Sequence, residues 1–237
     1  MTIKFTNDYS PNFSKKKRSK KNIHFIILHY TGMKSEKLAI RRLLSIQSEV
    51  ACHFLIRKNG NIINIVPELY SAWHAGKSSW KKHRSLNKNS IGIEIVNSGH
   101  NFKNEKFTRK QITSLKFLLK KLIKKYNIKK NNILGHSDIS PDRKKDPGEK
   151  FPWKALSYSG LVLWHKLSNK FLKKNRRIIC NPKEMKFFFK NLKKIGYKIT
   201  AKKTKAVYAF QRRFRPELVD GVVDKECFFI SLSLKNL

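Results

Sequence analysis

Acidic residues and cysteines are scarce in this chain of 237 residues. Aspartate and glutamate together number 15 against 54 lysines and arginines, which gives a formal net charge of +39. The three cysteines, Cys52, Cys180 and Cys227, are far apart, and none belongs to a C-x-x-C pair. This spacing excludes a disulfide framework and a cysteine-rich zinc site, so we expect each cysteine to be a small buried side chain.

Long apolar runs are also missing. The run at 23–28 is among the longest, far shorter than the roughly 20 residues that span a bilayer. Residues 1–21 are polar and then strongly basic, without the apolar core of a signal peptide. The sequence therefore predicts a cytoplasmic protein with no transmembrane segment. The periplasm or cell envelope is the alternative if a leader has been removed.

The excess of positive charge has two interpretations. A surface this basic attracts polyanions such as nucleic acid, acidic lipid or an anionic wall polymer. Alternatively, it reflects a genome that favours Lys, Asn and Ile codons, and the scatter of lysine runs at 15–17, 129–130 and 193–194 favours this interpretation. Because no common recognition motif is present, we expect no specific nucleic-acid partner.

Strands and helices alternate over the first two thirds of the chain. Apolar, β-branched runs predict strands, and Lys58-Asn59-Gly60 predicts a hairpin turn between two of them. Helical spacing of apolar residues predicts helices at 35–48 and after Thr108, which has capping-box spacing with Gln111. We expect an α/β fold with a mixed central β-sheet flanked by helices. Its strands are expected at residues 23–28, 52–56, 61–66, 90–96 and 133–134.

A small helical unit follows. Asn181, Pro182 and Glu184 form a typical helix start, a second helix is expected from about 200 to before Pro216, and Asp224 can cap a third. The sequence thus predicts a C-terminal three-helix domain after the α/β domain. The predicted parts are a basic flexible arm (1–22), the α/β domain (23–175) and the three-helix domain (178–237).

Three polar side chains stand at the ends of strands or in the loop that follows. His29 ends the first strand, His136 follows a later one, and Asp146 lies in the next loop. Two imidazoles and a carboxylate with a fourth position open suit a catalytic zinc ion, which lowers the pKa of its water to ~7. Taken singly, each residue is more often a packing or turn residue. The surrounding motifs decide between these interpretations.

Six segments occur in a fixed order along the chain. They are IILHYT at 26–31, CHFLI at 52–56, AWHAG at 72–76, SIGIE at 90–94, GHSDI at 135–139 and PDRKKDPG at 141–148. Together they closely resemble the AmpD-type N-acetylmuramoyl-L-alanine amidases, a family that includes phage amidases and animal peptidoglycan-recognition proteins. The resemblance covers roughly residues 23–155. It implies one Zn²⁺ ion bound by His29, His136 and Asp146.

The resemblance also implies which residues act on the substrate. Glu94 stands where the family has a glutamate that supports the attacking water, and Lys144 where a lysine faces the developing oxyanion. Amide hydrolysis needs a nucleophile, a charge sink for the tetrahedral oxygen and a proton donor for the leaving nitrogen, which suits these groups. The alternatives are that Glu94 only fixes a neighbouring loop and that Lys144 is a solvated charge.

Four residues are expected to bind substrate. By the resemblance, Trp73 and His74 line the cleft, where an aromatic face stacks on a sugar and an imidazole bonds a peptide carbonyl. Tyr30 is placed in the same group, and Arg143 would pair with a carboxylate of the stem peptide.

Two further residues are expected to support the site. His53 is interpreted as a buried structural histidine rather than a fourth metal ligand. Asp138 is expected to hold the loop of His136.

The C-terminal unit carries AVYAFQRRF at 206–214 and VDGVVD at 219–224. These segments resemble the three-helix peptidoglycan-binding domain of AmiD-like amidases; the alternative is a generic helical packing domain. The resemblances imply a zinc amidase that cleaves the bond between N-acetylmuramic acid and L-alanine. Its partner would be the sacculus or peptidoglycan fragments, including anhydro-muropeptides. The alternative is a catalytically inactive peptidoglycan-binding protein, and the sequence gives no oligomeric state.

Overall fold

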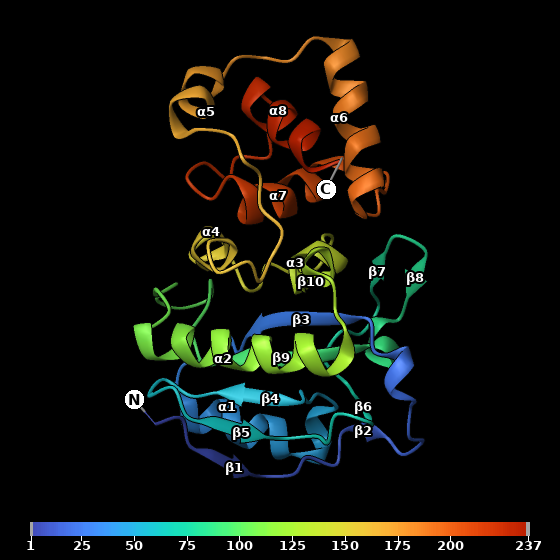
Figure 1. Cartoon of the computed structure of the whole chain (residues 1–237), viewed down its shortest axis with the longest axis vertical. Helices are drawn as coiled ribbons and strands as arrows, with labels where there is room; N and C mark the ends of the chain where they lie inside the picture. Colours follow the sequence, from blue (N-terminus) through green and yellow to red (C-terminus); the bar gives the residue numbers. More distant parts are fainter. Residues whose placement is uncertain (1, 236–237) are drawn as a thin grey trace.

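A six-stranded mixed sheet crosses the N-terminal two thirds of the chain in the computed structural model, which describes residues 2–235. The strand order is β1-β5-β4-β9-β3-β10, and β4 and β5 form the antiparallel pair among otherwise parallel neighbours (Figure 1). The predicted mixed sheet and its hairpin are confirmed. The strands are β1 (Phe5–Asn7), β3 (Phe25–Tyr30), β4 (Phe54–Ile56), β5 (Ile62–Asn64), β9 (Ser90–Ile95) and β10 (Ile133–Gly135).

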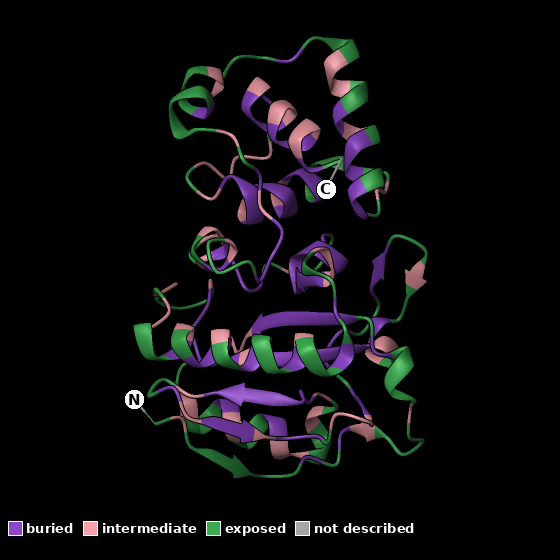
Figure 2. Ribbon diagram, in the orientation of Figure 1, coloured by how far each residue is buried: buried purple, intermediate pink, exposed green. Residues whose placement is uncertain are grey.

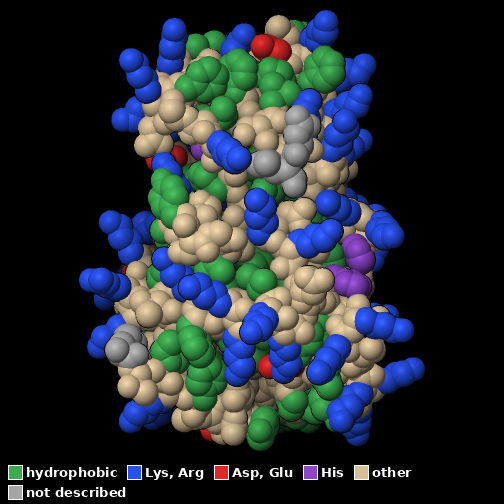
Figure 3. Space-filling view, in the orientation of Figure 1, with side chains coloured by type: hydrophobic (Ala, Val, Ile, Leu, Met, Phe, Trp, Pro, Cys, Tyr) green, Lys and Arg blue, Asp and Glu red, His purple; other side chains and the backbone are tan. Residues whose placement is uncertain are grey.

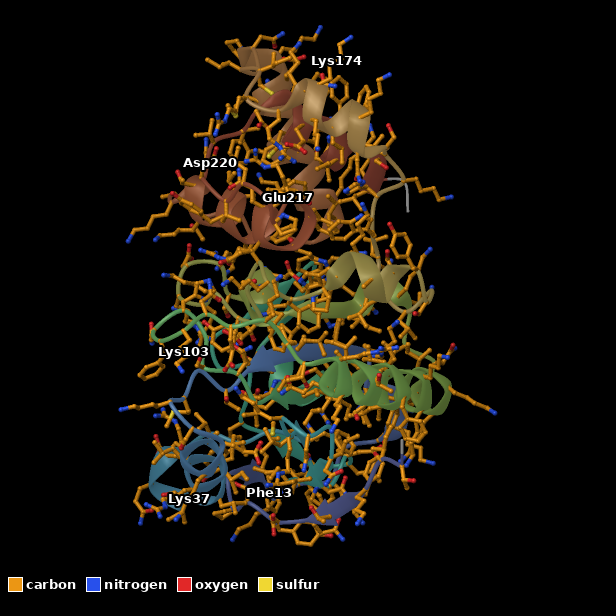
Figure 4. All side chains as sticks on the ribbon, turned by 90° about the vertical axis from the view of Figure 1, so that its left-hand side faces the viewer. Phe13, Lys37, Lys103, Lys174, Glu217 and Asp220 are labelled. Carbon is orange, nitrogen blue, oxygen red and sulfur yellow. The ribbon has the colours of Figure 1, made fainter. Side chains whose placement is uncertain are left out.

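Two helices, α1 (Glu36–Leu44) and α2 (Arg109–Tyr126), lie on opposite faces of this sheet. Figure 4 shows α1, marked by Lys37, on the left of the sheet and α2 on the right. The leucines of α2 pack in one cluster with Ile26 and Ile93. On the opposite face, Leu43 of α1 packs with Leu55 of β4 and Ile63 of β5. The capping box predicted at the start of α2 is present.

The N-terminal segment differs from the predicted flexible arm. Strand β1 pairs in parallel with β5, and β2 (Phe13–Ser14) pairs with β6 (Ser71–Ala72). The buried amide of Asn12 donates to the carbonyls of Ser45 and Val50, which ties the segment to the end of α1. The prediction was wrong because such short strands leave no alternating pattern in the sequence. Met1 lies outside the described residues.

The C-terminal region is helical, as predicted. It contains α5 (Asn169–Asn175), α6 (Pro182–Ile195), α7 (Lys203–Phe214) and α8 (Lys225–Leu234). In Figure 1 it lies beyond the β10 edge of the sheet. Phe188 and Phe210 belong to the same buried cluster as Phe25 and Ile27 of β3, so the helical region and the sheet share a core. The boundary between residues 175 and 178 stays a prediction.

Short elements connect these parts. Helices α3 (His136–Ile139) and α4 (Trp153–Ser157) lie between the sheet and the helical region in Figure 1. Strands β7 (Ser79–Trp80) and β8 (His83–Arg84) form a separate hairpin. Single 3₁₀ turns occur at Lys20–Asn22, Ile46–Ser48, Leu86–Asn89 and Lys130–Asn132.

Burial and charge follow this layering. The strands β3, β4 and β9 are almost wholly buried, whereas β1 at the sheet edge is exposed (Figure 2). All three cysteines are free and buried, as expected. On the face seen in Figure 3, lysine and arginine side chains are spread over both the sheet and the helical region. Within residues 2–235, no helix is both long and apolar enough to cross a membrane.

Candidate metal centre and its cleft

A cleft of about 430 Å³ opens on the α1 face of the sheet. Strands β3 and β9 place His29 directly opposite Glu94 in parallel register, so both side chains project from the same face. Helix α1 contributes Arg42 and Leu43 to one wall, and the loop after α3 contributes Lys144 to another. Strands β3 and β9 thus carry polar side chains at this level of the sheet, whereas Leu55 of β4, which pairs with Glu94, packs in an apolar cluster.

His29, His136 and Asp146 form a compact buried group, as predicted. Their candidate ligand atoms all lie within 4.8 Å of one another. Asp146 Oδ2 is 3.0 Å from Nδ1 of His29 and 3.2 Å from Nδ1 of His136. The three residues come from β3, the start of α3 and the following loop, so 117 residues of chain separate the first ligand from the last.

Electrostatics leave His29 and Asp146 in the ionisation states of metal ligands. Burial, followed by the nearby His136, lowers the pKa of His29 to about 4. Burial alone would raise the pKa of Asp146, but His136 and His29 hold it well below its ordinary value. At neutral pH the centre therefore offers a neutral imidazole at His29 beside a carboxylate. Metal ions bind histidine and aspartate in those forms.

The spacing of the donor atoms fits a zinc ion. Zinc–nitrogen bonds of ~2.0–2.1 Å in a tetrahedron put neighbouring ligand atoms about 3.3 Å apart. The 3.0 and 3.2 Å separations from Asp146 Oδ2 are close to this value. His136 Nε2 lies 3.2 Å from the carbonyl oxygen of Ala75, which can only accept a proton, so Nδ1 of His136 keeps its lone pair. The chemistry of the donor set therefore matches the metal that the sequence predicts.

Glu94 and Lys144 lie in the same cleft as the three candidate ligands. The Oε2 atom of Glu94 is buried and has no hydrogen-bond partner among the described residues. Burial, reinforced by the charge of Asp146, raises the pKa of Glu94 to about 8. A buried carboxyl oxygen without a protein partner is uncommon, and it suits a group that bonds to a reactant.

His74 is among the residues that line the cleft, and its ring contacts other protein groups. Its ring is buried, with Nδ1 3.1 Å from Nε2 of His29 and Nε2 3.1 Å from Oγ of Ser90. Both ring nitrogens are therefore engaged by the protein itself. The predicted bond from His74 to a peptide carbonyl stays a prediction, and the structure adds a contact between His74 and His29.

Trp73 departs from its prediction. Adjacent residues of an extended chain point to opposite sides, and because His74 points inward, Trp73 points to the surface. Its Nε1 lies 3.5 Å from Ser14 Oγ, and it is not among the residues that line the cleft. An aromatic platform for a sugar inside this cleft is therefore not supplied by Trp73.

Arg143 lines the cleft but is held mainly by backbone. Its Nη2 donates to the carbonyl oxygens of Ala75 and Lys77 at 2.5 and 3.0 Å and to Ser140 Oγ at 3.1 Å. Three acceptors on one nitrogen leave that atom no capacity for a ligand. A contact with a stem-peptide carboxylate would fall to Nη1, which makes no hydrogen bond within residues 2–235.

Tyr30 lies in the cleft wall as predicted and is part of a network that the sequence did not reveal. Its hydroxyl is 2.9 Å from Nδ1 of His100, and His100 Nε2 is 2.9 Å from Glu149 Oε2. The hydrogen bond from His100 is the main cause that lowers the pKa of Glu149 to about 2. The network ties the loop before α2 to the loop after Asp146, which closes one side of the cleft.

His53 and Asp138 occupy the supporting positions expected of them. His53 Nδ1 accepts from the backbone nitrogen of Gly92 at 2.9 Å, and its Nε2 lies 3.0 Å from the carbonyl oxygen of Tyr70. It is a fully buried link between strands and lies outside the His29, His136 and Asp146 group. Asp138 Oδ2 accepts from the backbone nitrogen of Gly135, beside His136.

Comparisons with known proteins agree with this geometry. A family model described as N-acetylmuramoyl-L-alanine amidase matches residues 19–149. AmiD of Escherichia coli is 33% identical over 229 residues, which cover 90% of this chain and 82% of AmiD. AmpD of Haemophilus influenzae is 42% identical over 108 residues, which cover 45% of this chain and 56% of AmpD.

A solved structure extends the similarity to the whole fold. Escherichia coli AmiD in complex with the substrate anhydro-N-acetylmuramic acid-L-Ala-D-γ-Glu-L-Lys superposes with a TM-score of 0.79 at 30% identity. The match covers 94% of this chain and 91% of AmiD. Fold and site together define an amidase with an α/β fold. The chain belongs to the N-acetylmuramoyl-L-alanine amidase family, and it is similar to AmiD through its helical C-terminal region as well as its sheet.

Proposed function

We propose that this chain is a zinc-dependent amidase that hydrolyses the bond between N-acetylmuramic acid and L-alanine in peptidoglycan or anhydro-muropeptides. The observation that carries the proposal is the buried group of His29, His136 and Asp146 in a cleft that also holds Glu94. The solved complex of AmiD with an anhydro-muramyl peptide as substrate supports the choice of bond and of ligand.

The three candidate ligands would hold the metal through Nδ1 of His29, Nδ1 of His136 and Oδ2 of Asp146. When bound, zinc supplies Lewis-acid polarisation of the scissile carbonyl and lowers the pKa of a water molecule. Burial of the three side chains excludes competing solvent and holds the donors in fixed positions. Two neutral donors and one carboxylate also leave a net positive charge on the centre, which suits a reaction that develops an oxyanion.

Glu94 serves as the proton carrier in this proposal. Its carboxylate accepts a proton from the attacking water, and the carboxylic acid then donates that proton to the leaving nitrogen of L-alanine. Burial raises the pKa of Glu94 toward the working pH, and a group that titrates near that pH exchanges protons readily in either direction. Oε2, which has no partner among the described residues, is the atom assigned to the water.

Lys144 supplies charge stabilisation. It lies on the cleft wall two residues before Asp146, and its charge contributes to lowering the pKa of His29. A fixed cation near the carbonyl oxygen stabilises the charge that develops on that oxygen. Tyr30 and Nη1 of Arg143 remain the candidates for contacts with the peptide.

Release of free stem peptide from purified anhydro-muropeptides and from sacculi tests the proposal. The zinc-loaded protein is expected to release peptide that begins with L-alanine, and removal of zinc by a chelator is expected to abolish release until zinc is restored. His29→Ala and Asp146→Ala are expected to abolish the release of peptide, and added zinc is not expected to restore it. Activity that survives either substitution would refute the assigned site.

The alternative function is a peptidoglycan-binding protein without catalysis. The presence of all three candidate ligands together with Glu94 and Lys144 argues against it. Metal analysis separates the two functions, because a protein that binds sacculi but contains no zinc after incubation with the ion would support binding alone.

A further inference from the structure

A chain of hydrogen bonds runs from the start of β9 to the side of His29 that faces away from Asp146. Ser90 Oγ donates to the carbonyl oxygen of Leu86 at 2.5 Å. The same Oγ lies 3.1 Å from Nε2 of His74, and Nδ1 of His74 lies 3.1 Å from Nε2 of His29. All of these side chains are buried, so they exchange hydrogen bonds with one another rather than with solvent.

The Leu86 carbonyl fixes the direction of every bond in this chain. A carbonyl oxygen only accepts, so the single hydroxyl proton of Ser90 is committed to Leu86. Ser90 Oγ can then only accept from His74, which places the ring proton of neutral His74 on Nε2. Nδ1 of His74 carries the lone pair and accepts from His29, which places the proton of His29 on Nε2.

The consequence at His29 is a lone pair on Nδ1. This atom is 3.0 Å from Oδ2 of Asp146. His136 reaches the same state by a shorter route, since its Nε2 donates directly to the carbonyl oxygen of Ala75. Both imidazoles therefore present Nδ1 lone pairs beside the same carboxylate oxygen. Three facing lone pairs repel one another unless a cation lies between them.

Strand β9 provides the space for the His74 ring as well as the Ser90 oxygen that accepts its hydrogen bond. Ser90, Gly92 and Glu94 are alternate residues and point to the same face of the sheet. A Cβ atom on Gly92 would lie 2.4 Å from Cγ of His74, so the imidazole rests directly on the glycine backbone. One strand face thus carries the acceptor for His74, the room for its ring and the proposed proton carrier.

We propose that Ser90 and His74 are positioning residues that select the Nε2–H tautomer of His29 and so prepare Nδ1 to bind the metal ion. The inference deepens the proposed function and rests on it for the identity of the metal. It also gives His74 a role at the metal centre in addition to its place in the cleft wall. Partners of this kind typically contribute 10–100-fold to metal affinity, because a ring that carries its proton on the wrong nitrogen must change tautomer before it binds.

Zinc affinity of the full chain, measured by competition with a chromophoric chelator, provides the first test. Ser90→Ala removes the acceptor and is expected to weaken zinc binding about 10–100-fold. Ser114→Ala is the matched control, because Ser114 is equally buried and donates to the Gly60 carbonyl at 2.6 Å but lies on α2, away from the cleft. Equal zinc affinity in the two variants would overturn the inference.

Substitution of His74 provides a rescue test. His74→Asn keeps an acceptor oxygen near the position of Nδ1, whereas His74→Phe keeps the shape of the ring without any acceptor. Zinc affinity is expected to be higher for His74→Asn than for His74→Phe, although phenylalanine fills the site better. The opposite order would mean that His74 acts only through packing.

The tautomers themselves can be observed without any variant or any metal. In the metal-free full chain labelled with ¹⁵N-histidine, two-bond ¹H–¹⁵N correlation spectra are expected to show Nε2–H forms for both His29 and His74 at neutral pH. An Nδ1–H form at either residue overturns the inference. Wild-type protein that binds no zinc overturns the proposed function instead, and the two failures are therefore distinguishable.

Discussion

Arg213 of α7 donates from Nη1 to Oδ2 of Asp138 in α3 at 2.6 Å, although 75 residues separate them in the chain. Both side chains are almost fully buried. Tyr197 donates its hydroxyl to the other carboxylate oxygen of Asp138 at 2.5 Å, and Nη2 of Arg213 donates to the carbonyl of Ile133 at 3.0 Å. Through these hydrogen bonds, the helical region therefore fixes the position of the turn that carries His136.

Removal of Arg213 should destabilise the protein strongly. Arg213→Leu leaves Asp138 as a buried carboxylate without its cation, which costs about 3–5 kcal/mol in comparable pairs. The free energy of unfolding in urea measures the loss. Lys58→Ala is the control, because its pair with Glu105 is partly exposed and contributes less than about 1 kcal/mol. Similar losses for the two variants would contradict the buried role of Arg213.

Truncation after residue 177 should affect more than attachment to the wall. Phe25 and Ile27 of β3 belong to one buried cluster with Phe188 and Phe210, so removal of the helical region exposes the sheet side of that cluster. We expect the truncated chain to lose cooperative unfolding and to lose activity on soluble muropeptides as well as on sacculi. A truncated chain that stays fully active on soluble fragments would show that the helical region serves attachment alone.

The sequence predicts the candidate ligands but not the residues that hydrogen-bond to them and fix their tautomers. His29, His136 and Asp146 fall in segments whose residue types and order resemble a known family, and the register of β3 with β9 places Glu94 beside them. Ser90 lies in one of those segments, yet a serine at the start of a strand gives no sign of what it bonds. Its role depends on the 3₁₀ turn that brings the Leu86 carbonyl to it.

The errors of prediction have similar physical causes. Trp73 and His74 share a motif, but extended backbone turns them to opposite sides, so they do not line one cleft together. The N-terminal arm carries no strand pattern because β1 is short and exposed on the sheet edge. The Arg213–Asp138 contact joins distant parts of the chain, which only the packed fold brings together.

Glu94 and Lys144 should affect turnover rather than zinc content. Glu94→Gln removes the proton carrier and is expected to lower kcat about 10²–10⁴-fold, and Lys144→Met is expected to lower it about 10²–10³-fold by removing a charge near the oxyanion. Steady-state kinetics on anhydro-muropeptides, with zinc content measured in parallel, checks both. Loss of zinc from either variant would mean that the substituted residue helps to bind the metal ion rather than to catalyse the reaction.

His53 should make the protein sensitive to acid. Burial, followed by the charge of Arg18, lowers the pKa of His53 to about 3. Between about pH 6.5 and 3, His53 is therefore protonated in the unfolded chain but neutral in the folded chain. Stability should therefore fall as the pH decreases through this range, and His53→Asn should flatten the dependence by up to about 1.4 kcal/mol per pH unit. Unfolding free energies measured at several pH values in EDTA check this, with the exposed His24→Asn as control. An unchanged slope in His53→Asn would contradict a neutral, buried imidazole.

Zinc should stabilise the fold only through an intact ligand set. A ligand that binds the folded state alone adds about 4 kcal/mol at a concentration 1,000 times its Kd. Thermal unfolding of the wild type is therefore expected to shift upward on zinc addition, and Asp146→Ala is expected to remove the shift while the variant still unfolds cooperatively. Asp142→Ala is the control, because Asp142 lies in the same loop but is exposed and does not line the cleft. If Asp146→Ala responds to zinc as Asp142→Ala does, the ion binds elsewhere on the chain, and the repulsion between Nδ1 of His29 and Asp146 must be relieved by a proton instead.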